Sequence, residues 1–234
     1  MFFDIPRVVD KSQPVHNMIP PNDVFIENAK KLRVRKNDLI ICYDHIGMLG
    51  APRAWFLFRL FGANNVRILN GGLLKWKAEG RPVESEEVPR EVFPLDPDTA
   101  DSYAYSKDLS QIVDLKYVHS IVPTLGTKDL YLLDARPAEK FNGTSPETRP
   151  GLRSGHIPGS VNIPYKAFLN PDGMTMKNES EVKKVFADNG INIEKKIIAS
   201  CMLGNVACNI LFALWMLGKK DAYLYDGSWC EYVS

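Results

Sequence analysis

The chain has 234 residues, of which 45% are hydrophobic and 24% charged, and its formal net charge is +1. This composition is typical of a globular protein long enough for two small cores. It offers no basic stripe for nucleic acid, no apolar run of the roughly 18 residues that a membrane span needs and no signal or transit peptide at the visible N-terminus. We therefore expect a soluble intracellular protein.

The first half of the sequence begins with an amphipathic pattern, "VFIENAKKLRVRKNDLI" (24–40), that predicts a helix, a turn and a strand. Residues 39–76 then predict a short strand, a glycine-bearing loop, an apolar helix that ends at Gly62, a second strand and an Asn-Gly turn. A segment rich in proline and acidic residues follows, and we expect it to be an interdomain linker over 86–107.

The second half repeats this order. It opens with the predicted strand "LYLLDAR" (130–136) and reaches the same helix, turn and strand pattern at 180–198. The 197–232 segment then matches 39–76, since Gly62 precedes Asn70 by eight residues and Gly218 precedes Asp226 by eight. The first half has no counterpart of the opening strand, so we expect a reduced sheet there or a chain truncated relative to its relatives.

The alternation of strands and helices predicts an α/β fold with a mostly parallel sheet, flanked by helices, in each half. We expect an N-terminal domain over 1–85 that lacks its opening strand, the linker over 86–107, and a C-terminal domain over 108–234.

The loop "CMLGNVA" at 201–207 is the main chemical signal, because it joins a strand end to a helix start. Ligands bind at the carboxyl ends of strands in open α/β sheets. The loop N–H groups and the helix N-terminus favour an anion there, so we expect a lowered pKa and a reactive thiolate at Cys201. Gly204 permits the backbone angles of such a loop.

Two other cysteine chemistries fit the loop less well. Cysteine phosphatases close a similar loop with an arginine, whereas this chain has Ala207 there and no arginine from Cys201 to Ser234. A papain-like site needs a paired histidine. Between Leu130 and Ser234 the only histidine is His156, which lies in a Gly-His-Ile-Pro-Gly turn and is more simply a structural hydrogen-bonder.

Several motifs together resemble the rhodanese-type sulfurtransferases, in particular the two-domain thiosulfate and 3-mercaptopyruvate enzymes. They are "DARPAEKFNGTSPETRPGLRSGHIPGSVNIPY", the cysteine loop and "YDGSWCEY" in the second half, and "APRAWFLFRLFG" and "NGGLLKWKAEGRPV" in the first. The resemblance covers essentially the whole chain. It implies tandem rhodanese-like domains with a catalytically silent first domain, where Asp44 stands in place of Cys201.

The resemblance also implies the reaction. Sulfane sulfur moves from 3-mercaptopyruvate or thiosulfate to Cys201 as a persulfide, and then to cyanide or a thiol such as thioredoxin or glutathione. No metal or other cofactor is implied. Basic residues hold the anionic donor in the family, and they correspond here to Arg149, Lys140 and Arg136. The remaining loop residues that would face the substrate are Met202, Leu203, Gly204, Asn205 and Val206.

The chain departs from the family pattern at several positions. Leu203 replaces the serine or lysine of the family loop, and Val206 replaces its threonine. An aspartate and a histidine of the first domain correspond to Pro6 and Asn17, with His16 one residue early. A second hypothesis is therefore that the chain is a degenerate rhodanese-fold protein that serves as a binding or structural subunit, with a protein partner at the shortened first domain.

We expect structural rather than catalytic roles for most of the other cysteines and for the tryptophans. Cys42 and Cys208 are expected to be buried, Cys208 being a candidate resolving thiol for an oxidised Cys201, and Cys230 to be exposed near the C-terminal edge. The four tryptophans are expected to pack in the core or between domains: Trp55, Trp76, Trp215 and Trp229. A mitochondrial location follows from the resemblance alone, with the cytoplasm as the alternative.

Overall fold

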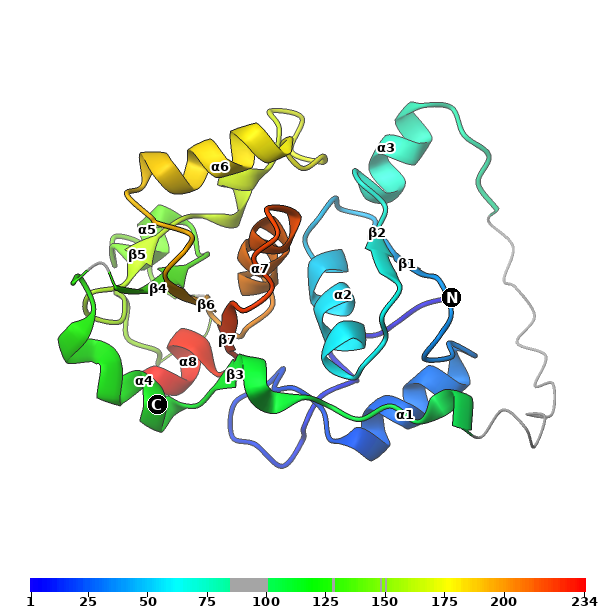
Figure 1. Cartoon of the computed structure of the whole chain (residues 1–234), viewed down its shortest axis with the longest axis horizontal. Coiled ribbons are helices and arrows are strands. Elements are labelled where there is room, and N and C mark those ends of the chain that lie inside the picture. Colours follow the sequence, from blue (N-terminus) through cyan, green and yellow to red (C-terminus); the bar gives the residue numbers. More distant parts are fainter. Residues whose placement is uncertain (85–100, 128, 148, 150) are drawn as a thin grey trace.

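The computed structural model describes residues 1–84, 101–127, 129–147, 149 and 151–234 (Figure 1). Residues 86–100 of the predicted linker lie outside the described part of the chain. Among the described helices, none is both long and apolar enough to cross a membrane.

The first half contains a two-stranded parallel sheet and three helices within the described residues. In chain order they are α1 (Asn22–Lys31), β1 (Ile40–Cys42), α2 (Ala51–Leu60), β2 (Val66–Ile68) and α3 (Gly72–Ala78). The helix, turn and strand predicted over 24–40 are confirmed by α1 and β1. The rings of Phe25 and Phe61 stack at 3.9 Å between centroids in the core of this half.

The second half holds a five-stranded sheet in the order β3-β7-β6-β4-β5, with every neighbouring pair parallel. The strands are β3 (Ile112–Val113), β4 (Leu130–Asp134), β5 (Val161–Asn162), β6 (Lys196–Ser200) and β7 (Tyr223–Tyr225). The α-helices are α4 (Leu115–Ile121), α5 (Ala138–Phe141), α6 (Glu179–Asp188), α7 (Ala207–Met216) and α8 (Ser228–Tyr232). Short 3-10 turns lie at Asp101–Tyr103, Leu109–Gln111, Val122–Thr124 and Tyr165–Phe168.

Both faces of this larger sheet are covered, as its apolar strands predict. Ile197 and Ala199 of β6 pack into one core cluster, and Ile198 packs into another with residues of α4 and α8. The predicted α/β class is confirmed. The predicted opening strand of the second half is β4, and the described residues of the first half contain no equivalent of it.

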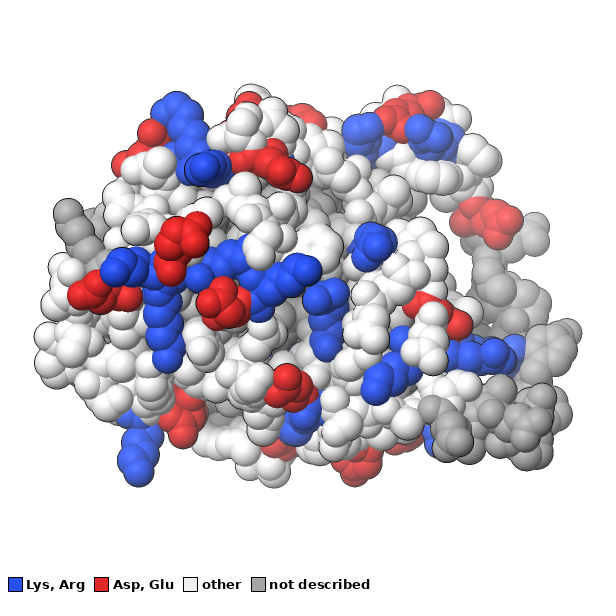
Figure 2. Space-filling view, viewed as in Figure 1, with Lys and Arg blue, Asp and Glu red and all other residues white. Residues whose placement is uncertain are grey.

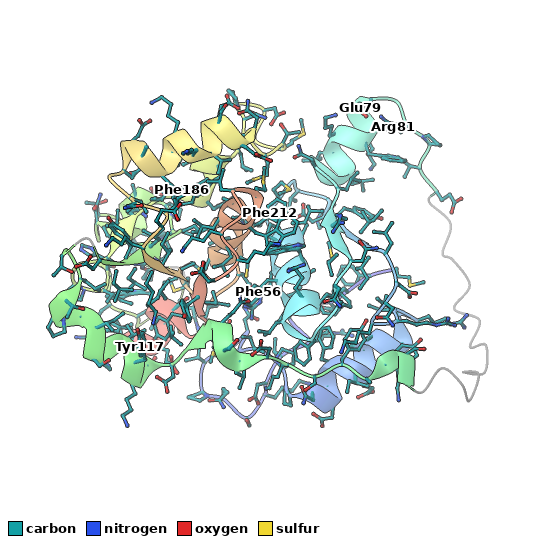
Figure 3. All side chains as sticks on the ribbon, in the orientation of Figure 1. Phe56, Glu79, Arg81, Tyr117, Phe186 and Phe212 are labelled. Atoms are coloured by element: carbon teal, nitrogen blue, oxygen red, sulfur yellow. The ribbon has the colours of Figure 1, made fainter. Side chains whose placement is uncertain are left out.

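The two halves meet along α2 and α7, which lie side by side at the centre of the molecule (Figure 1). The Trp55 ring contacts Phe212 and Trp215 edge-on, at 5.1 and 5.6 Å between centroids. Phe56 and Phe212 mark these two helices in the side-chain view (Figure 3). The interdomain packing expected of Trp55 and Trp215 is confirmed, whereas Trp76 donates to the carbonyl of Pro82 in its own half.

Candidate active site

Cys201 directly follows β6, at the carboxyl end of a central strand, and its side chain is only 1% exposed. The flanking strands β4 and β7 end at the same edge, so Asp134 and Tyr225 lie beside the loop. This is the edge at which parallel sheets bind ligands.

Three backbone N–H groups are directed at the Cys201 thiol, from Leu203, Val206 and Ala207. We call these groups the cysteine cradle. Burial nevertheless raises the pKa of Cys201, the nearby Asp134 carboxylate raises it further, and the cradle only partly offsets these effects. The expected lowering of this pKa is therefore wrong for the resting thiol, because desolvation outweighs the N–H dipoles.

The hydroxyl of Ser228 binds the backbone of the cysteine loop. Its Oγ accepts the backbone N–H groups of Cys201 at 3.0 Å and Gly204 at 3.1 Å, and the hydroxyl donates to the carbonyl of Tyr225. Ser228 has a φ of +54°, a left-handed conformation that is costly for a non-glycine residue. The turn after β7 therefore fixes the loop at its first residue and at Gly204.

The first half contains the same cradle with a carboxylate in it. Asp44 Oδ2 accepts the N–H groups of Gly50 at 2.8 Å and Ala51 at 2.9 Å, and its Oδ1 accepts that of Ile46 at 3.1 Å. These three donors are the repeat counterparts of Val206, Ala207 and Leu203. A loop of this shape therefore directs its N–H groups at the side chain of its first residue in both halves.

Gly204 is required at the turn of the cysteine loop for two reasons. Its φ is +75°, and a Cβ atom there would lie 2.5 Å from Oδ1 of Asp226. A side chain at this position would therefore displace either the loop or the carboxylate.

Arg136 is buried at 2% exposure and fully engaged by neighbouring groups. It donates to both oxygens of Asp134, to Glu147 at 2.8 Å and to the carbonyl of Gly155 at 2.8 Å. Its guanidinium also lies 5.0 Å from the ring centre of Trp229. These contacts give Arg136 the environment of a scaffold residue beside the loop.

The other two predicted cations lie on the segment after β4. Arg149 is half-buried, and its Nη1 donates to Sγ of Cys230 at 3.2 Å. The N–H of Cys230 in turn donates to the carbonyl of Met202, so Arg149 lies against the cysteine loop. Lys140 donates to the hydroxyl of Ser145 at 3.1 Å and to the carbonyl of Pro146, within its own loop.

The loop side chains and the first-domain residues differ in their surroundings. Met202, Leu203, Asn205 and Val206 are half-buried. The first-domain residue His16 is exposed, while the carbonyl of Asn17 accepts the Arg53 guanidinium at 2.9 Å. The structure thus joins Asn17 to the domain interface through its backbone.

Three further expectations concern thiols and His156. Cys42 and Cys208 are buried, as predicted. The predicted exposure of Cys230 is wrong, because this residue is 2% exposed under the Arg149 side chain. Nδ1 of His156 lies 2.8 Å from the carbonyl of Phe141, which confirms its structural hydrogen bond. Among the described residues, no group of three or more His, Cys, Asp or Glu side chains could hold a metal ion.

The sequence reasoning missed Ser228 and the buried pair of Arg53 with Asp226, whose Nη1 and Oδ1 atoms lie 2.7 Å apart. The register of the repeat could have indicated both, because Asp226 and Ser228 correspond to Asn70 and Gly72. Gly72 has a φ of +53°, nearly that of Ser228.

Known proteins are similar to this chain over nearly its whole length. The rhodanese-like domain model matches residues 5–79 and 120–234. A 3-mercaptopyruvate sulfurtransferase of Rattus norvegicus is 35% identical, over 99% of this chain and 74% of its own length. A thiosulfate sulfurtransferase of Gallus gallus is 36% identical, over 99% of this chain and 76% of its own.

Two solved structures share the fold. SseA from Escherichia coli, described as a 3-mercaptopyruvate sulfotransferase, has a TM-score of 0.82 and 31% identity, covering 97% of this chain and 80% of its own. The sub-stoichiometric sulfur transferase subunit of yeast mitochondrial complex I has a TM-score of 0.84 and 30% identity, covering 98% and 79%. The chain therefore belongs to the rhodanese family and carries two rhodanese-like domains.

Proposed function

We propose that this protein is a sulfurtransferase of the thiosulfate and 3-mercaptopyruvate type, with Cys201 as the sulfur carrier. The single observation that carries the proposal is the cysteine cradle: three N–H groups surround the Cys201 thiol, and the same cradle in the first half holds the Asp44 carboxylate. A site built for an anion suits a thiolate and a persulfide. The first domain, with Asp44 in its cradle, has no such carrier.

With 3-mercaptopyruvate as donor, Cys201 attacks the donor sulfur, the carbon–sulfur bond breaks, and the products are a Cys201 persulfide and pyruvate. The thiol hydrogens account for the methyl hydrogen of pyruvate and the persulfide hydrogen. With thiosulfate, the sulfur–sulfur bond breaks and sulfite leaves. A thiol acceptor such as thioredoxin or glutathione, or cyanide, then removes the outer sulfur and restores Cys201.

The burial of Cys201 indicates when the thiol loses its proton during the reaction. Because desolvation raises the pKa of Cys201, the resting thiol stays mainly protonated at neutral pH. Deprotonation would accompany donor binding, when the cradle N–H groups act on the developing negative charge in a site that excludes water.

Arg149 is the cation best placed for the anionic donor, since it is half-buried and lies against the cysteine loop. Its planar guanidinium can bind a carboxylate or sulfonate in a bidentate manner. Arg136 would orient the site through its carboxylate partners, and Lys140 would add charge from its loop. Leu203 and Val206 offer apolar contacts where the family has polar ones. The preference between 3-mercaptopyruvate and thiosulfate is therefore the property to measure.

A donor assay tests the proposal. Pyruvate release from 3-mercaptopyruvate and sulfite release from thiosulfate should be measured with cyanide, glutathione and thioredoxin as acceptors. We expect turnover with at least one donor and none in Cys201→Ser. Cys42→Ser, which removes a buried thiol of the first half, should turn over like the wild type. Turnover that survives in Cys201→Ser would contradict the proposal.

A second candidate function is that of a subunit in a larger assembly. One face of β1 is open, with Leu39, Ile41 and Tyr43 exposed by 58%, 55% and 54%, and a similar protein is a subunit of yeast mitochondrial complex I. The same similarity supports a mitochondrial location, with the cytoplasm as the alternative. Folded protein that releases neither pyruvate nor sulfite would favour this function.

A further inference from the structure

A buried ion pair joins the two domains directly behind the cysteine loop. Arg53, in the first turn of α2, is 1% exposed, and Asp226, directly after β7, is 2% exposed. Nη1 of Arg53 lies 2.7 Å from Oδ1 of Asp226. The other carboxylate oxygen accepts the backbone N–H of Ile19 at 2.6 Å. Both of these donors to Asp226 belong to the first domain.

The pair also packs against the turn of the cysteine loop at Gly204. A Cβ atom on Gly204 would lie 2.5 Å from Oδ1 of Asp226 and 3.3 Å from Nη1 of Arg53. Cys208 closes the same space, because its Sγ donates to the carbonyl of Gly204 at 3.4 Å and its thiol lies beside Arg53. The ion pair therefore lies directly against Gly204, with no room for a side chain between them.

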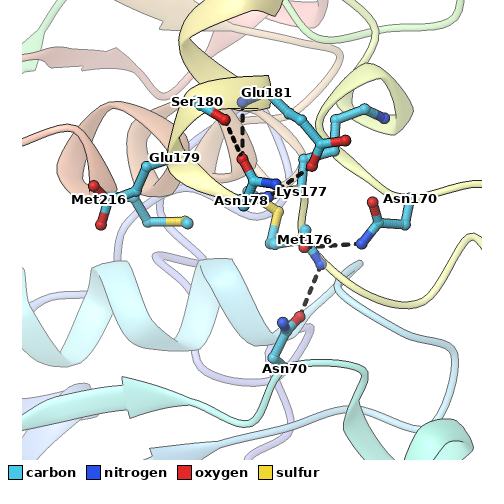
Figure 4. Close-up of a pocket in the computed structure, with 9 residues that line it drawn as sticks. All are labelled: Asn70, Asn170, Met176, Lys177, Asn178, Glu179, Ser180, Glu181 and Met216. Carbon is cyan, nitrogen blue, oxygen red and sulfur yellow. Dashed lines mark hydrogen bonds between the residues drawn. The ribbon is translucent and has the colours of Figure 1, made fainter.

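The internal repeat provides a comparison within the same molecule. Arg53 lies nine residues before Gly62, as Asn209 lies nine before Gly218, and Asp226 corresponds to Asn70. Oδ1 of Asn70 accepts the N–H of Met176 at 2.8 Å (Figure 4), so the hydrogen bond across the domains is repeated.

The charges, however, occur at only one of the two equivalent sets of positions, that of Arg53 and Asp226. Asn70 and Asn209 are neutral, and the buried amide of Asn209 has no hydrogen-bond partner within the described part of the chain. The charged pair therefore lies beside the cysteine loop, whereas two neutral asparagines occupy the equivalent positions of the repeat.

Stability alone does not explain the pair, because desolvation of two buried charges largely cancels their attraction. From its contacts and its one-sided placement, we propose that Arg53 is a positioning residue for sulfur transfer: it holds Asp226 against Gly204 and so fixes the cradle N–H groups on Cys201. The silent domain then takes part in the reaction. The role in sulfur transfer rests on the proposed function, whereas the positioning of the thiol does not.

The charged groups around the thiol determine how the test is read. Asp134 faces Cys201 from β4, with Arg136 on its other side, and Asp226 and Arg53 stand behind the loop. Loss of Arg53 would loosen the cradle and leave the Asp226 carboxylate unpaired. Both changes disfavour the thiolate, so the midpoint of thiol reactivity should move to higher pH.

Iodoacetamide alkylation of Cys201, followed by peptide mass spectrometry across pH, measures this without any sulfur donor. In Arg53→Met we expect a midpoint about one pH unit higher, which is about tenfold less thiolate at a given pH below it. Arg59→Met is the matched control, since Arg59 lies on the same helix and interface, 5.5 and 5.3 Å from the Trp55 and Trp215 ring centres. Its profile should match the wild type.

A double variant covers the case in which Arg53→Met does not fold. Arg53→Asn with Asp226→Asn installs the two neutral residues that the repeat has at the equivalent positions, and it leaves no unpaired buried charge. It should show the same upward shift, with turnover reduced about tenfold. A wild-type profile in the folded double variant, or an equal shift in Arg59→Met, would overturn the proposal. If the wild type took no sulfur from either donor, the proposed function would fail while this profile still decided the positioning role.

Discussion

At the scale of single residues, the environment of Cys201 combines a thiol with a cradle of N–H groups that partly offsets its burial. The cradle depends on the backbone of a loop with one left-handed glycine, Gly204. Substitution of this residue therefore tests the cradle without touching the sulfur.

Gly204→Ala should reduce persulfide formation by about 100-fold, the usual effect of losing one oriented N–H donor. The added methyl group would lie 2.5 Å from the Asp226 carboxylate and would force the loop away. Rapid-quench persulfide formation measures the loss. Gly190→Ala is the control, because its φ is +71° but nothing lies within 4 Å of the new Cβ. It should cost about 1–2 kcal/mol of stability and leave the rate unchanged. Equal rates in both variants would be inconsistent with the role of Gly204.

The pKa direction of Cys201 gives a second residue-scale prediction. Because burial raises this pKa above its ordinary value, the Cys201 thiol of the free protein ionises at a higher pH than an exposed thiol does. Wild-type alkylation by iodoacetamide should have its midpoint above about 9. A midpoint below about 8 would mean that the cradle outweighs desolvation.

The three N–H groups around Cys201 could be predicted from its loop, but not the sign of its pKa shift. Sequence shows which N–H groups can surround a thiol, whereas desolvation depends on atoms that the rest of the fold brings in. The Arg136 contacts with Asp134 and Glu147 were missed for the same reason, since they arise from the path of the loop after β4.

At the scale of elements, the two halves use matched strands in different surroundings. Ile41 of β1 and Ile198 of β6 occupy equivalent repeat positions, yet they are 55% and 0% exposed. The difference arises because α4 and α8 cover Ile198, while the described residues place no helix equivalent to α4 over Ile41.

This contrast predicts unequal stability effects. Ile198→Ala should lower the free energy of unfolding by about 2–5 kcal/mol, whereas Ile41→Ala should lower it by less than about 1 kcal/mol. Urea unfolding followed by tryptophan fluorescence measures both. A large effect at Ile41 would show that this face is covered in solution.

The order of the elements was predictable because helix and strand periodicities alternate and recur at equal intervals. The strand at 130–136 and the helix and strand at 180–198 are confirmed in place by β4, α6 and β6. The short strand β3 and the short helix α5 were not predicted, because such brief elements depend on neighbours rather than on periodicity.

At the scale of the whole molecule, the two halves are related by repetition. Lysine and arginine mix with aspartate and glutamate over the face in Figure 2, so this face offers no single-sign surface. The buried charges beside the cysteine loop include the pair of Arg53 with Asp226. The two members of this pair are 173 residues apart, so local periodicity could not indicate it and only the register of the repeat could.

Intact-protein mass spectrometry after separate incubation with 3-mercaptopyruvate and thiosulfate tests the central claim most directly, that Cys201 in its cradle carries sulfur. The account predicts one added sulfur atom per chain with at least one donor, removed by a thiol and absent in Cys201→Ser. Folded, reduced protein that gains no sulfur from either donor, or gains it equally in Cys201→Ser, would contradict it.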